Sequence, residues 1–488
     1  MPGVVISTSV RTGPSNATVR ESSQLFVVGL AERGPSDRAV LIQSIADFED
    51  IFGEYISNSY LHPTVETFFE EGGTQVYVAR TVGASATIGS LELLDSASNE
   101  VITLTANGAG AWSSSVGIEV LRPTTSSMKL NMYYNGDLVY STGTVTSSSQ
   151  AAGRINSSAV ASRYVTAEVN SASALPIATP AGNPTELSAG DSKNTFVTDA
   201  NLIASLSLFN DALGTGAVTI ADSFSSSIHD ALVSHANTYS RIALLCAVSN
   251  STAANAAAVA SAVKGGDNGE HAAMYYPWVE VPTSVNGVTR IIPPLGYVAA
   301  KRAVAHNQTG PHLPAAGLIS AARFVVGLNA EVDKVNGDAL DEAGVNAIRV
   351  IQNTVRIYGA RSLSSDTENF RYITQQDVVN SIVTECYRSL EDLVFSTIDG
   401  RNTIFANIEA RLVVILAAMR DLGALYPAFD VNGRQIDNGY TVRCDASLNP
   451  TSQLATGLVK AKVGVRVSSV GDQIQIDIVK SNLTASVI

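Results

Sequence analysis

The chain has 488 residues, of which 45% are hydrophobic and 15% are charged, and its formal net charge is −13. This length is too great for one hydrophobic core and predicts roughly two to four domains, while the apolar content excludes a disordered chain. The acidic balance excludes general nucleic-acid binding, which needs a clustered excess of basic residues. So small a share of charge suits a surface that meets other copies of the chain, although a Ser/Thr-rich exterior is the simpler explanation.

The cysteines and the first residues indicate where the protein is made. Cys246, Cys386 and Cys444 lie far apart and offer neither a disulfide framework nor the spacing of metal ligands. The N-terminal residues lack the basic and apolar regions of a signal peptide, and no run of about 18 apolar residues could span a membrane. We therefore expect synthesis in a reducing cytoplasm and no direct insertion into a membrane.

Residues 1–20 are expected to form an extended N-terminal arm. Val4, Val5 and Ile6 favour a strand, and Gly13-Pro14 interrupts regular structure. An extended segment of this length reaches roughly 60 Å, farther than an arm needs for its own domain. A frayed terminus is the common alternative.

An α/β core domain is predicted over residues 21–82 and 185–340, because strand-like and helix-like runs alternate there. A glycine-rich turn before a helix raises the possibility of phosphate binding, but neither the dinucleotide nor the P-loop glycine motif is present. The expected elements are strands at 25–35, 74–80, 241–248 and 272–282 and helices at 44–52, 60–71, 228–236 and 253–263.

An inserted all-β domain is predicted over residues 83–184. Charges become sparse there, Ser, Thr, Ala and Gly dominate, and several runs alternate between apolar and polar residues. Asn135-Gly136 between two such runs predicts a hairpin with a type I′ turn. Simple decoration of the surface is the expected role, and an adhesive or receptor-binding role is the alternative.

A C-terminal domain is predicted over residues 341–471. A β-rich run at 345–363 is followed by two amphipathic helices, whose apolar faces are expected to pack in the core. The first has Thr374 and Asp377 as its capping box, and the second is ended by Gly423. Between residues 343 and 459 every basic residue is an arginine, which pairs with carboxylates better than lysine does. Residues 472–488 form the predicted C-terminal arm, a strand with one apolar face made by Ile474, Ile476 and Ile478.

Several short motifs follow one another along these domains. They are Pro2-Gly3-Val4, D-F-E-x-x-F-G from Asp47, P-P-x-G-x-V-A from Pro293, V-R-I-Y-G-A-R-S-L from Val355, Y-x-V-x-C-D from Tyr440, and Asn449-Pro450. Their order resembles that of contractile tail sheath proteins, which form the sleeve around the tube of contractile bacteriophages, R-type pyocins and related injection machines. The resemblance covers most of the chain outside the inserted domain. It departs from the family pattern at residues 188–192, which lack two glycines.

The resemblance implies a mixed α/β, multidomain fold and a structural role without catalysis or cofactors. Such a subunit polymerises helically around a tail tube and contracts to drive the tube through a target cell envelope, for genome ejection or effector delivery. The implied partners are other copies of the chain, the tube protein, and the baseplate and tail terminator proteins. The implied location is the virion tail or injection particle, after synthesis in the bacterial host.

The resemblance also suggests which residues act in assembly. Val4, Val5 and Ile6 in one arm and Ile474, Ile476 and Ile478 in the other are candidates for strand exchange between subunits. The C-terminal domain is expected at the inner radius and the inserted domain outside. Arg401 and Arg411 are candidate contacts with the tube, and salt bridges within the chain or between subunits are the alternative for both.

An enzyme remains the main competing hypothesis. The six histidines form no H-E-x-x-H motif, and no G-x-S-x-G motif occurs, although a scattered Ser/His/Asp triad can be recognised only by geometry. A cytosolic α/β enzyme of unknown substrate with a β-rich insert therefore stays open. A surface-layer or adhesin protein would need an export signal that the sequence lacks.

Overall fold

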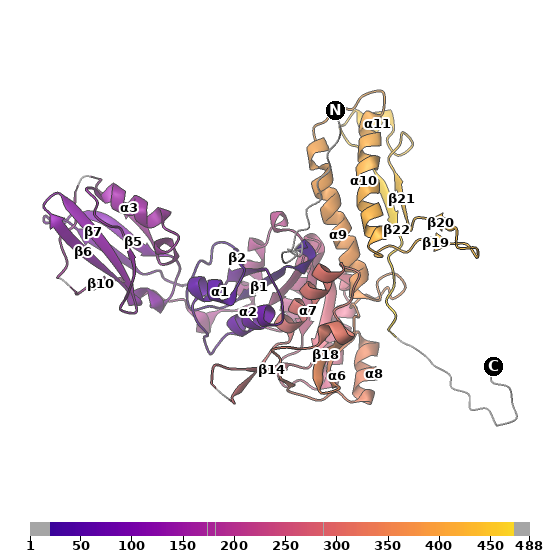
Figure 1. The fold of residues 1–488 in the computed structure, drawn as a ribbon, viewed down its shortest axis with the longest axis horizontal. Helices are drawn as coiled ribbons and strands as arrows, with labels where there is room; N and C mark the ends of the chain where they lie inside the picture. Colours follow the sequence, from indigo (N-terminus) through magenta and orange to yellow (C-terminus); the bar gives the residue numbers. More distant parts are fainter. Residues whose placement is uncertain (1–19, 173, 181, 286, 473–488) are drawn as a thin grey trace, which may run out of the picture.

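The computed structural model describes residues 20–472 apart from 173, 181 and 286. These residues form an elongated molecule of three units (Figure 1). A central core carries the β unit, residues 83–191, at one end and the C-terminal unit, residues 372–472, at the other. The mixed α/β, multidomain fold class expected from the sequence is confirmed.

The core is built on one eight-stranded sheet in the order β18-β17-β13-β12-β11-β1-β3-β2. The six inner strands are parallel, while β2 and β18 are antiparallel at the two edges. Strands covered on both faces are apolar at nearly every position, and β1, β11, β12 and β13 are buried throughout. The strands are β1 Leu25–Gly29, β2 Val40–Ile42, β3 Val76–Arg80, β11 Ala217–Ile220, β12 Ile242–Cys246, β13 Ala272–Tyr276, β17 Val345–Ile351 and β18 Thr354–Tyr358.

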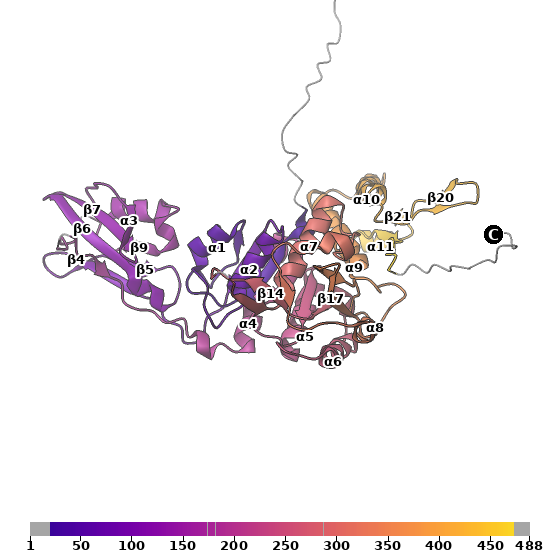
Figure 2. The same ribbon diagram turned by 60° about the horizontal axis from the view of Figure 1, so that its bottom comes forward.

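Helices cover both faces of this sheet. Alternate residues of β1 enter opposite layers, so that Leu25 and Val27 pack with α1, α2 and α7, while Phe26 and Val28 pack with α4, α5, α6 and α8. Figure 2 shows α5, α6 and α8 on the side of the sheet opposite α7. The helices are α1 Ile45–Phe52, α2 Leu61–Glu70, α4 Asp199–Ser205, α5 Ser226–Thr238, α6 Ala253–Lys264, α7 Leu295–Gln308 and α8 Lys334–Ala343.

The structure corrects the predicted boundary at residue 341. β17 pairs in parallel with β13, and β18 pairs with β17, so both strands belong to the core sheet rather than to the C-terminal domain. The crossover from β13 to β17 includes helix α8, as a parallel connection requires. The predicted strand at 272–282 is also two elements, because β13 ends before Pro277 and β14 joins a separate small sheet. That sheet contains β14 Val279–Pro282, β15 Thr289–Ile292 and β16 Gly327–Leu328.

The β unit has its own hydrophobic interior between two sheets and one helix. The hairpin predicted at Asn135-Gly136 is confirmed, since both residues have positive φ and Tyr134 pairs with Asp137 across the turn. The sheets have the orders β4-β5-β9 and β10-β6-β7-β8. The elements are β4 Ser90–Leu94, β5 Glu100–Ala106, β6 Val116–Thr124, β7 Ser127–Tyr134, β8 Asp137–Ser141, α3 Ser148–Ser157, β9 Val165–Val169 and β10 Thr185–Glu186.

Two buried arginines join the β unit to the core. Arg80, at the end of β3, is fully buried and donates hydrogen bonds to four backbone carbonyls, one of which, Ala109, belongs to the β unit. The Arg33 guanidinium lies over the rings of Tyr134 and Tyr164, 5.0 and 5.1 Å from their centroids. The β unit is therefore joined to the core by side-chain contacts as well as by the two chain segments that connect them.

The C-terminal unit is a helical hairpin with short strands against one side (Figure 1). The predicted capping box was wrong in position, because helix α9 begins at Ile373 and the side chain of Gln375 accepts the Tyr372 N–H, 2.9 Å away. Gly423 ends the second helix with φ +83°, as predicted. The elements are α9 Ile373–Leu390, α10 Thr403–Asp421, β19 Ala428–Phe429, β20 Gln435–Asp437, β21 Tyr440–Arg443, α11 Thr451–Leu454 and β22 Lys462–Val465.

Candidate functional site

The groups that could bind a metal or transfer a proton were located in the described part of the chain. Within residues 20–472, apart from the three gaps, no cluster of His, Cys, Asp and Glu could hold a metal ion, and no helix is apolar enough over a sufficient length to cross a bilayer. His229 and His271 are buried against the backbone carbonyls of Cys246 and Arg241. Burial lowers the pKa of His235 to about 3, assisted by Arg241 beside it. These histidines are neutral parts of the core.

The place where α/β sheets bind ligands is filled by the protein itself. The strand order reverses between β1 and β11, and ligands of such folds bind at the carboxyl ends of the strands there. Asp222, just after β11, accepts hydrogen bonds from the N–H groups of Leu30 and Tyr60, both at 2.6 Å, and from the Ser59 hydroxyl at 3.0 Å. Burial raises the pKa of Asp222 to about 6 despite these hydrogen bonds. A side-chain carboxylate therefore occupies the position that an anionic ligand would take.

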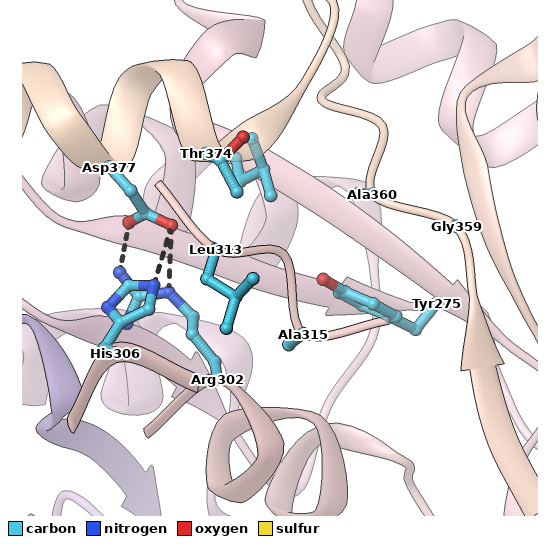
Figure 3. A pocket seen from close by; sticks show the side chains of 10 residues that line it. Tyr275, Arg302, His306, Leu313, Ala315, Gly359, Ala360, Thr374 and Asp377 are labelled. Atoms are coloured by element: carbon cyan, nitrogen blue, oxygen red, sulfur yellow. Dashed lines mark hydrogen bonds and ion pairs between the residues drawn. The ribbon is translucent and has the colours of Figure 1, made fainter. Parts of the chain in front are cut away.

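A small cavity lies where the core meets the C-terminal unit (Figure 3). Its volume is about 10 Å³, room for roughly one water molecule, and its lining includes Tyr275 and Thr374. On one side of it, Arg302 and His306 of α7 point toward Asp377 of α9. The cavity is too small for a metabolite, and the ion pair beside it is its main chemical feature.

The Arg302–Asp377 pair is buried on both sides, with each side chain at most 5% exposed. The Nε atom of Arg302 lies 3.3 Å from Oδ2 of Asp377, and a second nitrogen bonds the other oxygen. Burial alone would raise the pKa of Asp377, but Arg302 and then His306 hold it below its ordinary value. Burial, followed by the charge of Arg302, lowers the pKa of His306. The cluster therefore holds one cation and one anion, which joins the core to α9 at low net charge.

The C-terminal unit exposes strand edges. β21 and β22 pair only with each other as a two-stranded sheet in the part of the chain that the structure describes. One face of this sheet packs on the helical hairpin, where Val442 and Val463 contact the cluster around Val378 and Leu416. A two-stranded sheet is marginal by itself and leaves backbone donors and acceptors free along its edges. This sheet can therefore accept a further strand.

Apolar side chains are also exposed on this unit. On α9, Val383 and Tyr387 are one turn apart and exposed, and Val414 on α10 is 70% exposed. Phe395, in the loop between these helices, is fully exposed. The periodicity of both helices predicted core packing for their apolar faces, and this is wrong for part of α9. These side chains have no cover within the described chain.

The structure brings only some of the predicted assembly residues into view. Arg411 on α10 binds Asp392 through two nitrogens and donates to the Ser389 carbonyl, so it makes the intramolecular salt bridge that was the alternative to a tube contact. Arg401 is exposed just before α10. The strand-exchange candidates lie outside the described residues: Val4, Val5, Ile6, Ile474, Ile476 and Ile478.

Sequence reasoning missed the Arg302–Asp377 pair, because it assigned Asp377 to a capping box. The one available signal was Lys301-Arg302 in a helix that is otherwise apolar or small before His306, because charges on a buried helix require partners. Lys301 meets this requirement with Glu71, at 2.6 Å. Nothing in the sequence identified which carboxylates are the partners.

The fold is found in solved structures from contractile assemblies. A sheath tail protein from Listeria innocua aligns over 87% of this chain and 89% of its own, with a TM-score of 0.60 and 15% identity. The sheath complex of an extracellular contractile injection system, in its contracted state, aligns over 99% and 98% of the two chains, with a TM-score of 0.56 and 15% identity. The contracted helical sheath of the anti-feeding prophage aligns over 99% of both chains, with a TM-score of 0.56 and 14% identity. No protein-family profile and no curated protein sequence matches the chain.

Proposed function

We propose that this protein is the repeating subunit of a contractile sheath. The observation that carries the proposal is a likeness extending over nearly the whole chain, from the core through both appended units, to sheath proteins of several contractile assemblies. Within residues 20–472, β21 and β22 pair only with each other and several apolar side chains of the C-terminal unit are uncovered, which suits a chain that is completed by other copies. In this role the protein polymerises around a tube, and the polymer then shortens to drive the tube through a cell envelope.

We further propose that the subunits are linked by exchanged strands. A sleeve that changes length must let its subunits rotate and slide without detaching, which rigid face-to-face packing resists. A strand donated to a neighbour's sheet is held by main-chain hydrogen bonds, while the segment behind it absorbs the movement. The donors are Val4, Val5 and Ile6 at one end and Ile474, Ile476 and Ile478 at the other. The two-stranded sheet β21–β22 is the acceptor that the described chain offers.

The proposed arrangement sets the C-terminal unit against the tube and the β unit outward. Two features support it: the units lie at opposite ends of the elongated molecule, and residues 341–488 are nearly neutral, at net −2, against −11 for residues 1–340. Arg401 and Arg411 are the proposed contacts with the tube, and Arg411 also pairs with Asp392 within the chain. Baseplate and terminator proteins would bind the two ends of the polymer, and the protein would reside in a virion tail or injection particle.

We propose that the chain has no catalytic activity. Contraction in this account draws on energy stored in the lattice of subunits, so no nucleotide or metal is needed. Titration calorimetry with ATP, GTP and zinc should show no stoichiometric binding. Binding of any one of them at a 1:1 ratio would favour the competing hypothesis of an enzyme.

Gel filtration followed by negative-stain microscopy tests the proposal. The purified full chain is expected to form hollow cylinders of variable length, alone or when mixed with its tube protein. Discrete small particles under both conditions would contradict a sheath role. A chain that ends at Gly471 gives a matched variant, which should remain a folded monomer and fail to polymerise. An unfolded or aggregated product would indicate instead that residues 472–488 complete the chain's own fold.

A further inference from the structure

The two ends of the described chain are each held by side chains that lie on or beside helix α9. We call residues 20–24 the N-terminal root and residues 470–472 the C-terminal root, because the proposed exchange segments begin beyond them. Arg388 of α9 pairs directly with the N-terminal root, and Asp377 of α9 binds the Arg302 that holds it. The C-terminal root is held by Arg361, which lies over the ring of Tyr372, the N-cap residue of α9. Neither the fold nor the proposed strand exchange requires that the two roots share a fixed point.

The N-terminal root is clamped between α7 and α9. The backbone carbonyl of Ser22 accepts a hydrogen bond of 2.6 Å from Arg302, whose guanidinium also binds Asp377. His306 places its Nδ1 atom 3.2 Å from the same carbonyl. Ser22 is 5% exposed, so this carbonyl bonds away from water and depends on these partners.

Two further contacts hold the same root on either side of Ser22. The N–H group of Arg20 donates to the side-chain oxygen of Asn307 on α7, at 2.9 Å. Glu21 forms an ion pair with Arg388, in the last turn of α9. Three consecutive residues are therefore fixed, each to a different partner, before the chain passes into β1.

The C-terminal root is held by a second arginine. Arg361 binds Asp341 through two nitrogens, at 2.7 and 2.8 Å, and lies 3.0 Å from a carboxylate oxygen of Asp472. The Arg361 guanidinium also lies 5.3 Å from the ring centroid of Tyr372, the N-cap residue of α9. The arginine that holds the C-terminal root therefore packs on the residue that precedes α9.

The beginning of α9 is in turn fixed to the core. Tyr372 and Asp377, which contact the two arginines that hold the roots, are five residues apart, and Asn380 on the next turn donates to the carbonyl of Arg241 at 3.2 Å. Tyr372, Asp377 and Asn380 are all buried. The start of α9 is thus a buried block that contacts the core and the arginines of both roots.

We propose that this block positions the two exchange segments by fixing the points at which they leave the molecule. The inference rests on the proposed strand exchange. A tethered segment binds its target with an effective concentration set by the tether, and a longer or looser tether lowers that concentration. Because residues 20–22 and 472 are held, the length of each tether is counted from these residues. Arg302 and Arg361 are therefore positioning residues for the links between copies.

The Glu21–Arg388 pair is the best place to test this. Removing either member of the buried Arg302–Asp377 pair would leave an uncompensated charge in the interior, and the chain would unfold for reasons unrelated to assembly. Glu21 and Arg388 are 30% and 48% exposed, so charge reversal there leaves a solvated side chain. The pair can be inverted without emptying a buried site.

The experiment compares Glu21→Arg, Arg388→Glu and the double variant that carries both. Each single variant should raise the critical concentration for polymerisation, measured by pelleting, by about threefold to tenfold, because repulsion frees the root. Its thermal unfolding as a monomer should stay within about 2 °C of the parent. The double variant restores an opposite-charge pair and should return to within about twofold of the parent. Arg38→Glu, at an exposed pair in the core, is the control and should change nothing.

The inference is wrong if the single variants polymerise like the parent, or if the double variant polymerises as poorly as either single one. A monomer destabilised in step with its polymerisation would also contradict it, since the pair would then act through the fold alone. A parent chain that forms no polymer would contradict the proposed function itself, before any variant is compared.

Discussion

The β unit and the C-terminal unit differ in how far each completes its own interior. The β unit encloses a cluster of 20 buried hydrophobic residues between its two sheets and α3. The C-terminal unit, of similar length, has two separate clusters of 6 and 3 such residues among those described. A hydrophobic interior of the first kind supports independent folding, whereas the second leaves apolar side chains and strand edges uncovered. Among the described residues, the β unit encloses an interior of its own, and we propose that the C-terminal unit is completed by contacts with other copies of the chain.

The largest difference between the two units is expected when each is produced alone. Residues 83–192 begin and end beside each other, since the N–H group of Gly83 donates to the carbonyl of Ser192 at 2.9 Å. Produced alone, this segment should fold and unfold cooperatively on heating, monitored by near-ultraviolet circular dichroism. Residues 372–472 produced alone should show no cooperative transition. Cooperative melting of the second segment as a monomer would contradict the comparison.

Truncating a buried side chain in the β unit should have the next largest effect. Ile102 is fully buried, so Ile102→Ala in the excised unit should lower the free energy of unfolding by about 2–5 kcal/mol through lost burial and the cavity left behind. Ile88 in the same unit is half exposed, and Ile88→Ala should stay within about 0.5 kcal/mol of the parent. Urea denaturation measures both variants. Equal effects would mean that the described interior does not stabilise the unit.

These two units also show what sequence patterns can predict. The Asn-Gly hairpin and the end of α10 at Gly423 follow from local rules, which act within a few residues. β17 was assigned to the wrong domain because its partner β13 lies about 70 residues away, and parallel pairing leaves no local trace. Val383 and Tyr387 follow the same helical period as buried residues, so their exposure was invisible in the sequence. The Arg302–Asp377 pair depends on two helices meeting, which no spacing encodes.

The core between the units should show a stability that depends on pH through Asp222. Its pKa in the folded state, about 6, is above the ordinary value of 3.8, so the folded protein binds this proton more tightly than the unfolded chain. Stability should therefore rise as the pH falls from about 7 to about 4, by at most about 3 kcal/mol from this group. The Asp222→Asn variant has no carboxyl group to titrate at this position, so its stability should not show this rise at low pH. Urea midpoints of both proteins across that range measure it, and parallel pH profiles would contradict the prediction.

The smallest effect on the monomer is expected at the exposed apolar side chains. Val414→Asp on α10 should change thermal unfolding of the monomer by no more than about 2 °C, because the side chain has no cover to lose. It should nevertheless reduce polymerisation, since a charge would be buried when copies meet. Leu138 is an exposed apolar residue of the β unit, so Leu138→Asp is the matched control and should polymerise normally. Equal polymerisation of both variants would contradict the claim that copies meet through the C-terminal unit and not through the β unit.

A cryo-EM reconstruction of the polymer formed by the full chain tests the central claim most directly. It should show a hollow helical assembly in which the C-terminal unit lines the inside, with strands of other copies added to the β21–β22 sheet. The β unit should project outward and leave most of its surface in solvent. An assembly in which β21 and β22 keep free edges, or in which the β unit forms the contacts between copies, would contradict the account.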